Sequence, residues 1–148
     1  MFFCLSCALT ACRREGGAPS AEAKKLESRQ TGIRGETYAY GYLRRHGYIF
    51  VARNFTPRAS KGEIDMLGYH GKTLAFVDVR TVREEMSALP ELSVTQGKQH
   101  LLARTAQHFL AERRVPECPC RFDVVAIDNS PGKPPVVRLH KDAFRPQM

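Results

Sequence analysis

The sequence predicts one α/β domain over residues 30–148, in which helices flank a mixed central sheet. Apolar periods follow one another in the order helix, three strands, helix, two strands, or αβββαββ. A chain of 148 residues has room for one core, because an ordinary domain has about 100–200 residues. Hydrophobic residues make up 43% and charged residues 26%, which is the balance of a folded globular domain.

Residues 1–29 are expected to form a flexible N-terminal extension. Residues 13–29 are rich in Gly, Ala, Ser, Glu and Lys and lack a clear apolar stripe. Residues 1–12 are mildly apolar, but no basic residue precedes the apolar run, which is too short for the core of an export signal. Cys4, Cys7 and Cys12 lack a fourth zinc ligand at a usual spacing. Export and a zinc site are therefore both disfavoured.

The first predicted helix begins near Thr31, and its apolar side is formed by Ile33, Tyr40 and Leu43, with Ala39 beside them. His46 and Gly47 provide the basic last turn and the following glycine that are typical of a helix end. Gly35 and Gly41 each lower helix propensity by about 1 kcal/mol relative to alanine. Close approach of another element would explain that cost.

The second helix and five strands follow. Runs of apolar and β-branched residues predict strands at 48–55, 62–69, 73–81, 121–128 and 136–140. The turn between the second and third strands comprises residues 70–72. Thr95 can cap a helix that ends near Arg114, whose apolar stripe is Leu101, Leu102, Thr105, Ala106, Phe109 and Leu110. Residues 86–93 are expected to form a loop.

The charge of the chain favours a polyanionic partner. Lysine and arginine total 23 against 15 acidic residues, which gives a net charge of +8. Such an excess suits nucleic acid, because each neutralised phosphate releases counterions, although many unrelated proteins are equally basic. Five cysteines in two clusters give no disulfide framework, so a reducing, cytoplasmic location is expected. No segment is long and apolar enough to span a membrane.

Three carboxylates interrupt apolar patterns. Glu36 projects from the apolar face of the first helix, while Asp65 and Asp78 lie within apolar strands, where aspartate is disfavoured. The alternative for Glu36 is a place at the edge of the stripe, paired with Arg34 or Arg44. For the two aspartates, an ion or a charged partner is expected to offset the cost of burial.

Strand pairing decides whether these acids meet. A two-residue loop at His70-Gly71 pairs Tyr69 with Lys72, Glu63 with Asp78, and Asp65 with Phe76. Glu63, Asp65, Asp78 and Arg80 then share one face, with Asp65 and Asp78 as diagonal neighbours. A slip of one residue would separate the aspartates onto opposite faces.

Paired carboxylates suit a magnesium ion, which removes their repulsion and leaves positions for a phosphate and a water. Arg80 follows Asp78 by two residues, and Lys98 lies one turn before the apolar stripe of the second helix. Either cation could stabilise charge on a phosphate. The alternative is that both are ordinary solvated charges.

Several segments together resemble one family. They are Gly35-Glu36, Gly62-Glu63-Ile64-Asp65, Phe76-Val77-Asp78-Val79-Arg80, Lys98, Cys120-Arg121-Phe122-Asp123-Val124-Val125 and Asp142-Ala143-Phe144. The chain resembles the YraN family of bacterial proteins from about Thr31 to Phe144. This likeness implies a restriction-endonuclease-like fold, in which an aspartate on one strand and an acid-x-lysine motif on the next hold metal and water.

The resemblance also implies roles for individual residues. Asp65 matches the first metal-binding aspartate, Asp78 the acid of the paired motif, Arg80 its lysine, and Glu36 the glutamate of the first helix. The usual Glu-Val-Lys is here Asp78-Val79-Arg80. Arginine can stabilise phosphate charge, but its guanidinium cannot lose a proton to act as a base.

Three functions remain open at this point. The leading hypothesis is an endonuclease that uses Mg²⁺ or Mn²⁺ on DNA, including branched or junction DNA, with Glu36, Asp65 and Asp78 as metal ligands and Arg80 and Lys98 completing the catalytic group. A nucleic-acid-binding protein without cleavage is favoured by the unusual Asp78 and Arg80. The third is a structural partner in a larger assembly.

Nucleic-acid contacts are expected from four cations: Lys61, Arg80, Lys98 and Arg121. A homodimer would allow both strands of a duplex to be cut, and the sequence leaves that assembly open.

Overall fold

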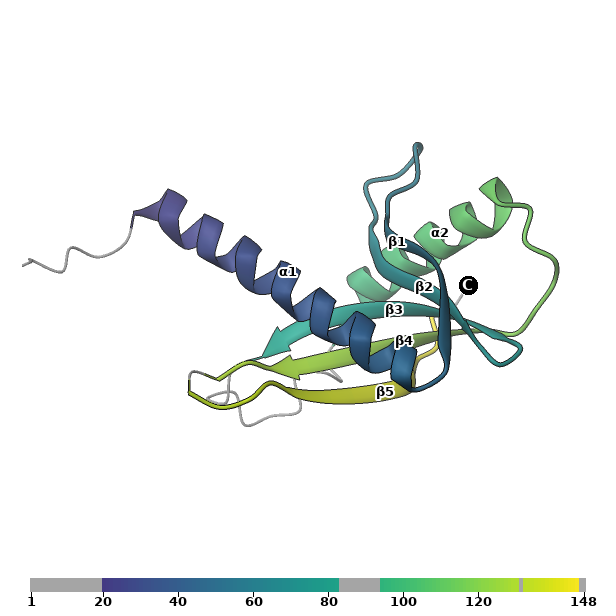
Figure 1. The fold of residues 1–148 in the computed structure, drawn as a ribbon. Helices are drawn as coiled ribbons and strands as arrows, with labels where there is room; N and C mark the ends of the chain where they lie inside the picture. The colour runs from purple at the N-terminus through teal and green to yellow at the C-terminus, as the bar shows by residue number, and fades with distance from the viewer. Residues whose placement is uncertain (1–19, 83–93, 131, 147–148) are drawn as a thin grey trace, which may run out of the picture.

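The computed structural model describes residues 20–82, 94–130 and 132–146. Its elements are α1 (Ala21–Arg45), β1 (Tyr48–Phe55), β2 (Ile64–His70), β3 (Thr73–Val82), α2 (Gln96–Glu112), β4 (Cys120–Asp128) and β5 (Val136–Phe144), as drawn in Figure 1. The predicted order αβββαββ is confirmed. The loop predicted at 86–93 and residues 1–19 lie outside the described residues.

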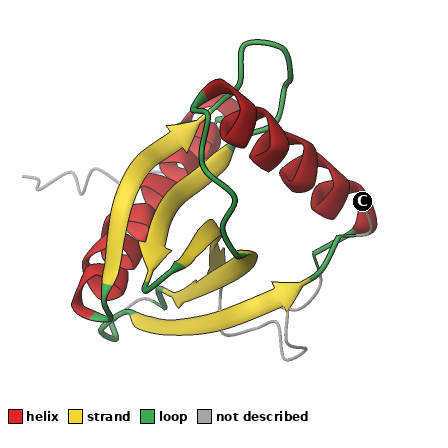
Figure 2. Cartoon of the chain, turned by 90° about the vertical axis from the view of Figure 1, so that its right-hand side faces the viewer, coloured by secondary structure: helices red, strands yellow, loops and turns green. Residues whose placement is uncertain are grey.

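The strands form one five-stranded sheet in the order β1-β2-β3-β4-β5. Neighbours are antiparallel except for β3 and β4, which are parallel. A parallel pair needs a crossover connection, and α2 lies in the connection between these two strands. The predicted mixed sheet is thereby confirmed, and Figure 2 shows its twist together with the two helices.

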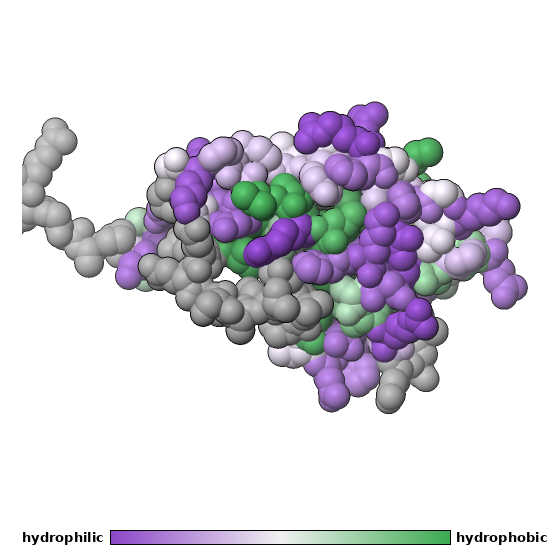
Figure 3. All heavy atoms as spheres, turned by 90° about the horizontal axis from the view of Figure 1, so that it is seen from below, coloured by the Kyte–Doolittle hydropathy of each residue, from purple (hydrophilic) through white to green (hydrophobic). Residues whose placement is uncertain are grey.

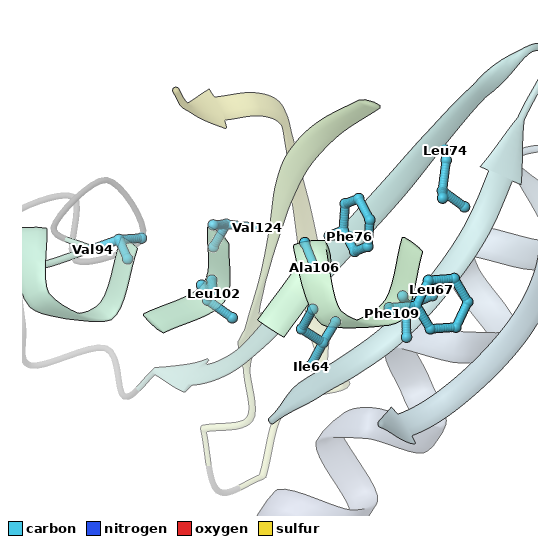
Figure 4. Close-up of a cluster of buried hydrophobic side chains, with 9 residues drawn as sticks. All are labelled: Ile64, Leu67, Leu74, Phe76, Val94, Leu102, Ala106, Phe109 and Val124. Carbon is cyan, nitrogen blue, oxygen red and sulfur yellow. The ribbon is translucent and has the colours of Figure 1, made fainter. Parts of the chain in front are cut away.

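The two helices cover opposite faces of the sheet. On β3, Leu74 and Phe76 belong to a core cluster with α2, whereas Ala75 and Val77 belong to a cluster with α1. Successive side chains of a strand point to opposite faces, so the alternation assigns one helix to each face. Figure 4 shows the α2-side cluster, to which the helix contributes Leu102, Ala106 and Phe109.

Helix α1 begins at Ala21, ten residues before the predicted start at Thr31. Residues 21–30 are exposed throughout, and the N-terminal half of the helix extends beyond the sheet in Figure 1. This half buries nothing, so it shows no apolar stripe, and its start is marked instead by Ser20, whose hydroxyl accepts from the Ala23 amide at 3.2 Å.

The buried stripe of α1 also differs from the prediction. It consists of Gly35, Ala39 and Leu43, while Ile33 is 56% exposed. A Cβ atom on Gly35 would lie 2.7 Å from the Thr81 hydroxyl, so the close approach expected at this glycine is present. At Gly41, by contrast, a Cβ would meet only the tip of Arg45, at 3.9 Å.

The turn between β2 and β3 comes later than predicted. His70 pairs with Thr73, so the two-residue loop is Gly71-Lys72, and Gly71 has a φ of +64° that glycine adopts at little cost. The predicted strand pairs are wrong by two residues: Tyr69 with Lys72, Glu63 with Asp78, and Asp65 with Phe76. A shift of two leaves each side chain on its predicted face, because the side-chain period is two.

Candidate functional site

Asp65 and Asp78 are brought together where the β2–β3 ladder ends. The last regular pair is Met66 with Val77, and one further step places Asp65 opposite Asp78. At that step, Asp65 Oδ2 accepts a hydrogen bond from the Val79 amide at 2.6 Å. A side chain therefore bridges the two strands where backbone pairing stops.

Burial raises the pKa of Asp65 to about 7. The negative charges of Asp78 and Glu36 raise this pKa further, while the hydrogen bond from Val79 and the charge of Lys98 lower it. A carboxyl group with such a pKa is about half protonated at neutral pH. Perturbation of this kind, caused by burial together with neighbouring charges, is typical of functional sites.

Asp78 is held by two cations. Its side chain is only 7% exposed; Oδ2 lies 2.9 Å from Arg80 Nε and Oδ1 lies 3.1 Å from Lys98 Nζ. Lys98 reaches the sheet from the first turn of α2, where the Thr95 hydroxyl accepts from the Lys98 amide at 3.3 Å. Both cations are therefore paired with Asp78 rather than only solvated.

Glu36 approaches the same site from α1. With its amide oriented to donate, Asn54 bonds Glu36 Oε2 at 3.2 Å and the Asp65 carbonyl at 3.1 Å. Glu36 is half-buried, and its hydrogen-bond partner is Asn54 rather than Arg34 or Arg44, the partners of the alternative interpretation. Sequence reasoning missed Asn54, whose φ of 48° is tolerated by asparagine better than by most residues.

The donor chemistry at this point suits a hard cation. Mg²⁺ is usually bound through one or two carboxylates, with waters and substrate phosphates completing its oxygen shell. In the part of the chain that the structure describes, no three His, Cys, Asp or Glu side chains are placed to hold one metal ion together. The predicted set of Glu36, Asp65 and Asp78 is thus not gathered as three ligands, whereas two aspartates match the donor number that Mg²⁺ takes.

Arg121 lies away from this group. It pairs across the sheet with Ala75, which faces α1, whereas Asp78 pairs with Val124, which faces α2. Its guanidinium is held by Asp123, with Nε 2.9 Å from Oδ1. The structure therefore does not bring Arg121 to the aspartate pair.

Lys61 and Glu63 both precede β2 and are exposed. In the described part of the chain, neither forms a hydrogen bond or an ion pair with Asp65 or Asp78. The expected contact of Lys61 with nucleic acid stays a prediction.

Gly62 sets the distance between the start of β2 and α2. A Cβ atom at this position would lie 1.9 Å from the hydroxyl oxygen of buried Thr105 and 3.2 Å from its Cβ. We expect Gly62→Ala to lower the free energy of unfolding by about 1–3 kcal/mol, because overpacking forces α2 to shift. Urea denaturation would measure the loss, and adding Thr105→Ala should recover part of it. Additive losses would contradict the proposed clash.

An α/β chain with a five-stranded mixed sheet, two helices and the order αβββαββ is compatible with the restriction-endonuclease-like fold. Comparison with known proteins agrees with the resemblance seen in the motifs. The model of the uncharacterised protein family UPF0102 matches residues 35–127, and the chain belongs to this family, which is the YraN family.

Similar proteins occur in several bacteria. The chain is 38% identical to a UPF0102 protein of Geotalea uraniireducens over 120 residues, covering 81% of this chain and 93% of that relative. It is 39% identical to one of Koribacter versatilis, covering 83% and 85% of the two chains. Identity to one of Symbiobacterium thermophilum is 40%, covering 79% and 98%. These names assign no activity.

Neither described helix combines the length and the hydropathy that crossing a membrane requires.

Proposed function

We propose that this protein is a metal-dependent nuclease that hydrolyses phosphodiester bonds in DNA. The observation that carries the proposal is the meeting of Asp65 and Asp78 at the end of the β2–β3 ladder, with Arg80 and Lys98 on Asp78. Acids on neighbouring strands beside two cations can serve a divalent ion and a phosphate at one place.

Asp65 and Asp78 would hold the cation. Glu36 of α1 is near enough for its charge to raise the pKa of Asp65, and its carboxylate would contact the cation through a water. When bound, Mg²⁺ would polarise the scissile phosphate and lower the pKa of an attacking water. Because Asp65 has a pKa of about 7, it must lose its proton to become a full ligand, so cation binding should strengthen between about pH 6 and pH 8.

Lys98 and Arg80 would stabilise the negative charge that develops on the phosphate. The paired motif has arginine where its usual lysine stands, and the ammonium of Lys98 lies 3.1 Å from the same acid. A lysine is thus present at Asp78, although it comes from α2 rather than from β3. Arg80 adds a guanidinium, which can bind two phosphate oxygens at once.

The net charge of +8 supports a nucleic-acid substrate, because cations attract the phosphate backbone and release its counterions. The described surface in Figure 3 is mostly hydrophilic around a small hydrophobic area. A net positive charge also increases the rate at which a protein encounters DNA.

The test is cleavage of end-labelled flap, junction and duplex DNA with Mg²⁺ or Mn²⁺. Wild-type protein is expected to cut at least one form, and Asp65→Asn and Asp78→Asn should each lower the rate by about 10²–10³-fold. Lys98→Gln should lower it in the same direction. Glu112→Gln, which changes an exposed acid at the end of α2, is the matched control and should retain the wild-type rate.

A second function is favoured by the two ion pairs of Asp78, which occupy both of its oxygens. Under that reading the protein binds nucleic acid without cutting it, and the cations replace the metal. Binding of every DNA form without cleavage by either metal, and with equal affinity in EDTA, would favour this function over the nuclease. Cleavage of RNA alone would retain the chemistry and change the substrate.

A further inference from the structure

A groove lies on the face of the sheet that α2 covers. It has a volume of about 630 Å³ and lies between α2, the start of β4 and the end of β5. This volume is within the range of about 300–1,000 Å³ that small-molecule sites occupy. The aspartate pair is not among its lining residues, so the groove is distinct from the aspartate site.

Three aromatic rings form one wall of this groove. Phe76, Phe122 and Phe144 come from β3, β4 and β5, and all three line it. The ring centroids of Phe76 and Phe122 are 5.4 Å apart at 28°, and those of Phe122 and Phe144 are 5.0 Å apart at 21°. The rings therefore form a nearly parallel stack across the sheet. Phe144 lies on the edge strand and is half-buried, so the stack reaches the surface.

The charges of the groove are mainly positive. Its lining includes Lys141 and Arg145 against a single acid, Asp142, which leaves an excess of one positive charge. Arg121 also lines the groove, but its guanidinium lies on the α1 face of the sheet. Asp142 Oδ2 accepts hydrogen bonds from Arg145 Nε at 3.1 Å and Nη2 at 2.6 Å, and Asp123 holds Arg121. Lys141 and Arg145 are exposed, so both can meet phosphate at the rim.

We propose that this groove binds an unpaired base of a single-stranded nucleic acid. The base continues the stack formed by Phe122 and Phe144, and the phosphates beside it contact Lys141 and Arg145. Any base offers a flat aromatic face, so stacking combined with backbone cations is the usual design of sites for single strands. A duplex keeps its bases stacked inside and cannot reach the rings. The inference rests on the proposed function for its polynucleotide substrate.

The groove and the aspartate pair share one face of the sheet. Phe76 and Asp78 are two residues apart on β3, so their Cα atoms are about 7 Å apart. Along α2, Lys98 at the aspartates and Gln107 at the groove are nine residues apart, or about 13 Å. About four nucleotides, at 3.4 Å each, span this distance. A single-stranded nucleic acid held in the groove could therefore reach the aspartates. Unpaired bases beside a junction would fit this arrangement.

The test measures binding in EDTA, where metal-dependent cleavage cannot occur. Fluorescence anisotropy is recorded with a labelled dT12, with the same backbone made of abasic residues, and with a 12-base-pair duplex. Wild-type protein should bind the abasic strand about 5- to 100-fold more weakly than dT12, which is the effect of losing stacked bases. Phe144→Leu should weaken binding of dT12 by a similar factor and change binding of the duplex less than twofold.

Two lysine variants test the cations. Lys141→Gln should weaken dT12 binding and reduce the dependence of log Kd on log salt by about 0.7, the value for one phosphate contact on a single strand. Lys25→Gln removes the same charge from the exposed half of α1 and should leave dT12 binding unchanged. Thermal unfolding of Phe144→Leu shows whether this variant keeps the fold. The comparison of dT12 with the abasic strand uses the wild-type protein, so it does not depend on any variant.

Equal binding of dT12 and the abasic strand would overturn the inference, as would a Phe144→Leu variant that loses duplex and dT12 binding equally. These outcomes are distinct from failure of the nuclease proposal. Base-dependent binding without cleavage would remove the nuclease and keep the groove site. Cleavage that depends on Asp65, with no preference for bases over abasic residues, would keep the nuclease and remove the groove site.

Discussion

Asp65→Asn is expected to raise the free energy of unfolding at pH 8 by about 2–4 kcal/mol. Burial raises the pKa of Asp65 from 3.8 to about 7, so ionising it in the folded state costs up to about 4 kcal/mol at 1.36 kcal/mol per pKa unit. Asparagine carries no charge, and its carbonyl oxygen can still accept the hydrogen bond from the Val79 amide. The variant therefore removes the penalty and keeps the bond.

The sign of the pH dependence follows from the raised pKa. Between about pH 4 and pH 7 the folded protein holds the Asp65 proton and the unfolded chain has lost it, so stability from this group falls as pH rises through that window. Asp65→Asn should match the wild type near pH 4 and exceed it increasingly up to about pH 8. Urea denaturation at a series of pH values measures this difference directly.

Glu63→Gln is the matched control, because Glu63 is an exposed acid two residues before Asp65. Its effect on stability should be small and nearly independent of pH. A loss of stability in Asp65→Asn at pH 8, or a difference from wild type that does not grow with pH, would contradict the assigned burial of charge. If Asp65 is kept for function at a cost in stability, Asp65→Asn should be more stable than the wild type and should have lost cleavage.

The sequence was most informative where apolar runs are long. Residues 74–77 and 124–127 are buried on both faces, so the sequence shows them as continuous apolar strands. The apolar stripe of α2 likewise predicted that helix. The turn was misplaced by one residue, and the strand pairing therefore by two, because both His70-Gly71 and Gly71-Lys72 offer a glycine. The prediction that Asp65 and Asp78 share one face was unaffected by that error, since only a register shift by an odd number of residues would have placed them on opposite faces.

Long-range contacts of polar residues could not be predicted. The start of α1 at Ala21 is set by the N-cap residue Ser20 and not by burial, so no apolar period in the sequence indicates it. The contact between Asn54 and Glu36 requires a left-handed backbone at Asn54 and a particular approach of α1 to β1. The pairing of Lys98 with Asp78 depends on the position of α2 along the sheet. Propensity and period determine none of these distances.

A buried polar network was also missed, although Asp123 interrupts an apolar strand as plainly as Asp65 does. Asp123 is 0% exposed, and its carboxylate accepts from the Tyr48 hydroxyl at 2.9 Å, from Arg121 Nε at 2.9 and 3.1 Å, and from the Asp142 amide at 2.9 Å. Burial and the charge of Asp123 raise the pKa of Tyr48, which keeps its hydroxyl a donor. An acidic residue within an apolar strand therefore indicates a buried carboxylate with polar partners. Only the identity of those partners distinguishes a functional site from a structural network.

Asp123→Ala is expected to lower the free energy of unfolding by about 3–5 kcal/mol. The substitution leaves the half-buried guanidinium of Arg121 without its counter-charge and removes acceptors from Tyr48 and the Asp142 amide. Tyr48→Phe, which removes one donor, should cost only about 1–1.5 kcal/mol. Urea denaturation measures both losses, and Glu117→Ala in the exposed loop before β4 is a control that should change little.

The network also joins the start of β4 to the end of β5, because Asp142 has a left-handed φ of 52° at the irregularity where its amide meets Asp123. Phe144 follows two residues later and lines the groove. Asp123→Asn keeps the volume of the side chain, so it should fold better than Asp123→Ala while still loosening this end of β5. Weaker dT12 binding in a folded Asp123→Asn would link the network to the groove. A stability loss below about 1 kcal/mol in Asp123→Ala would instead show that water replaces the lost acceptors.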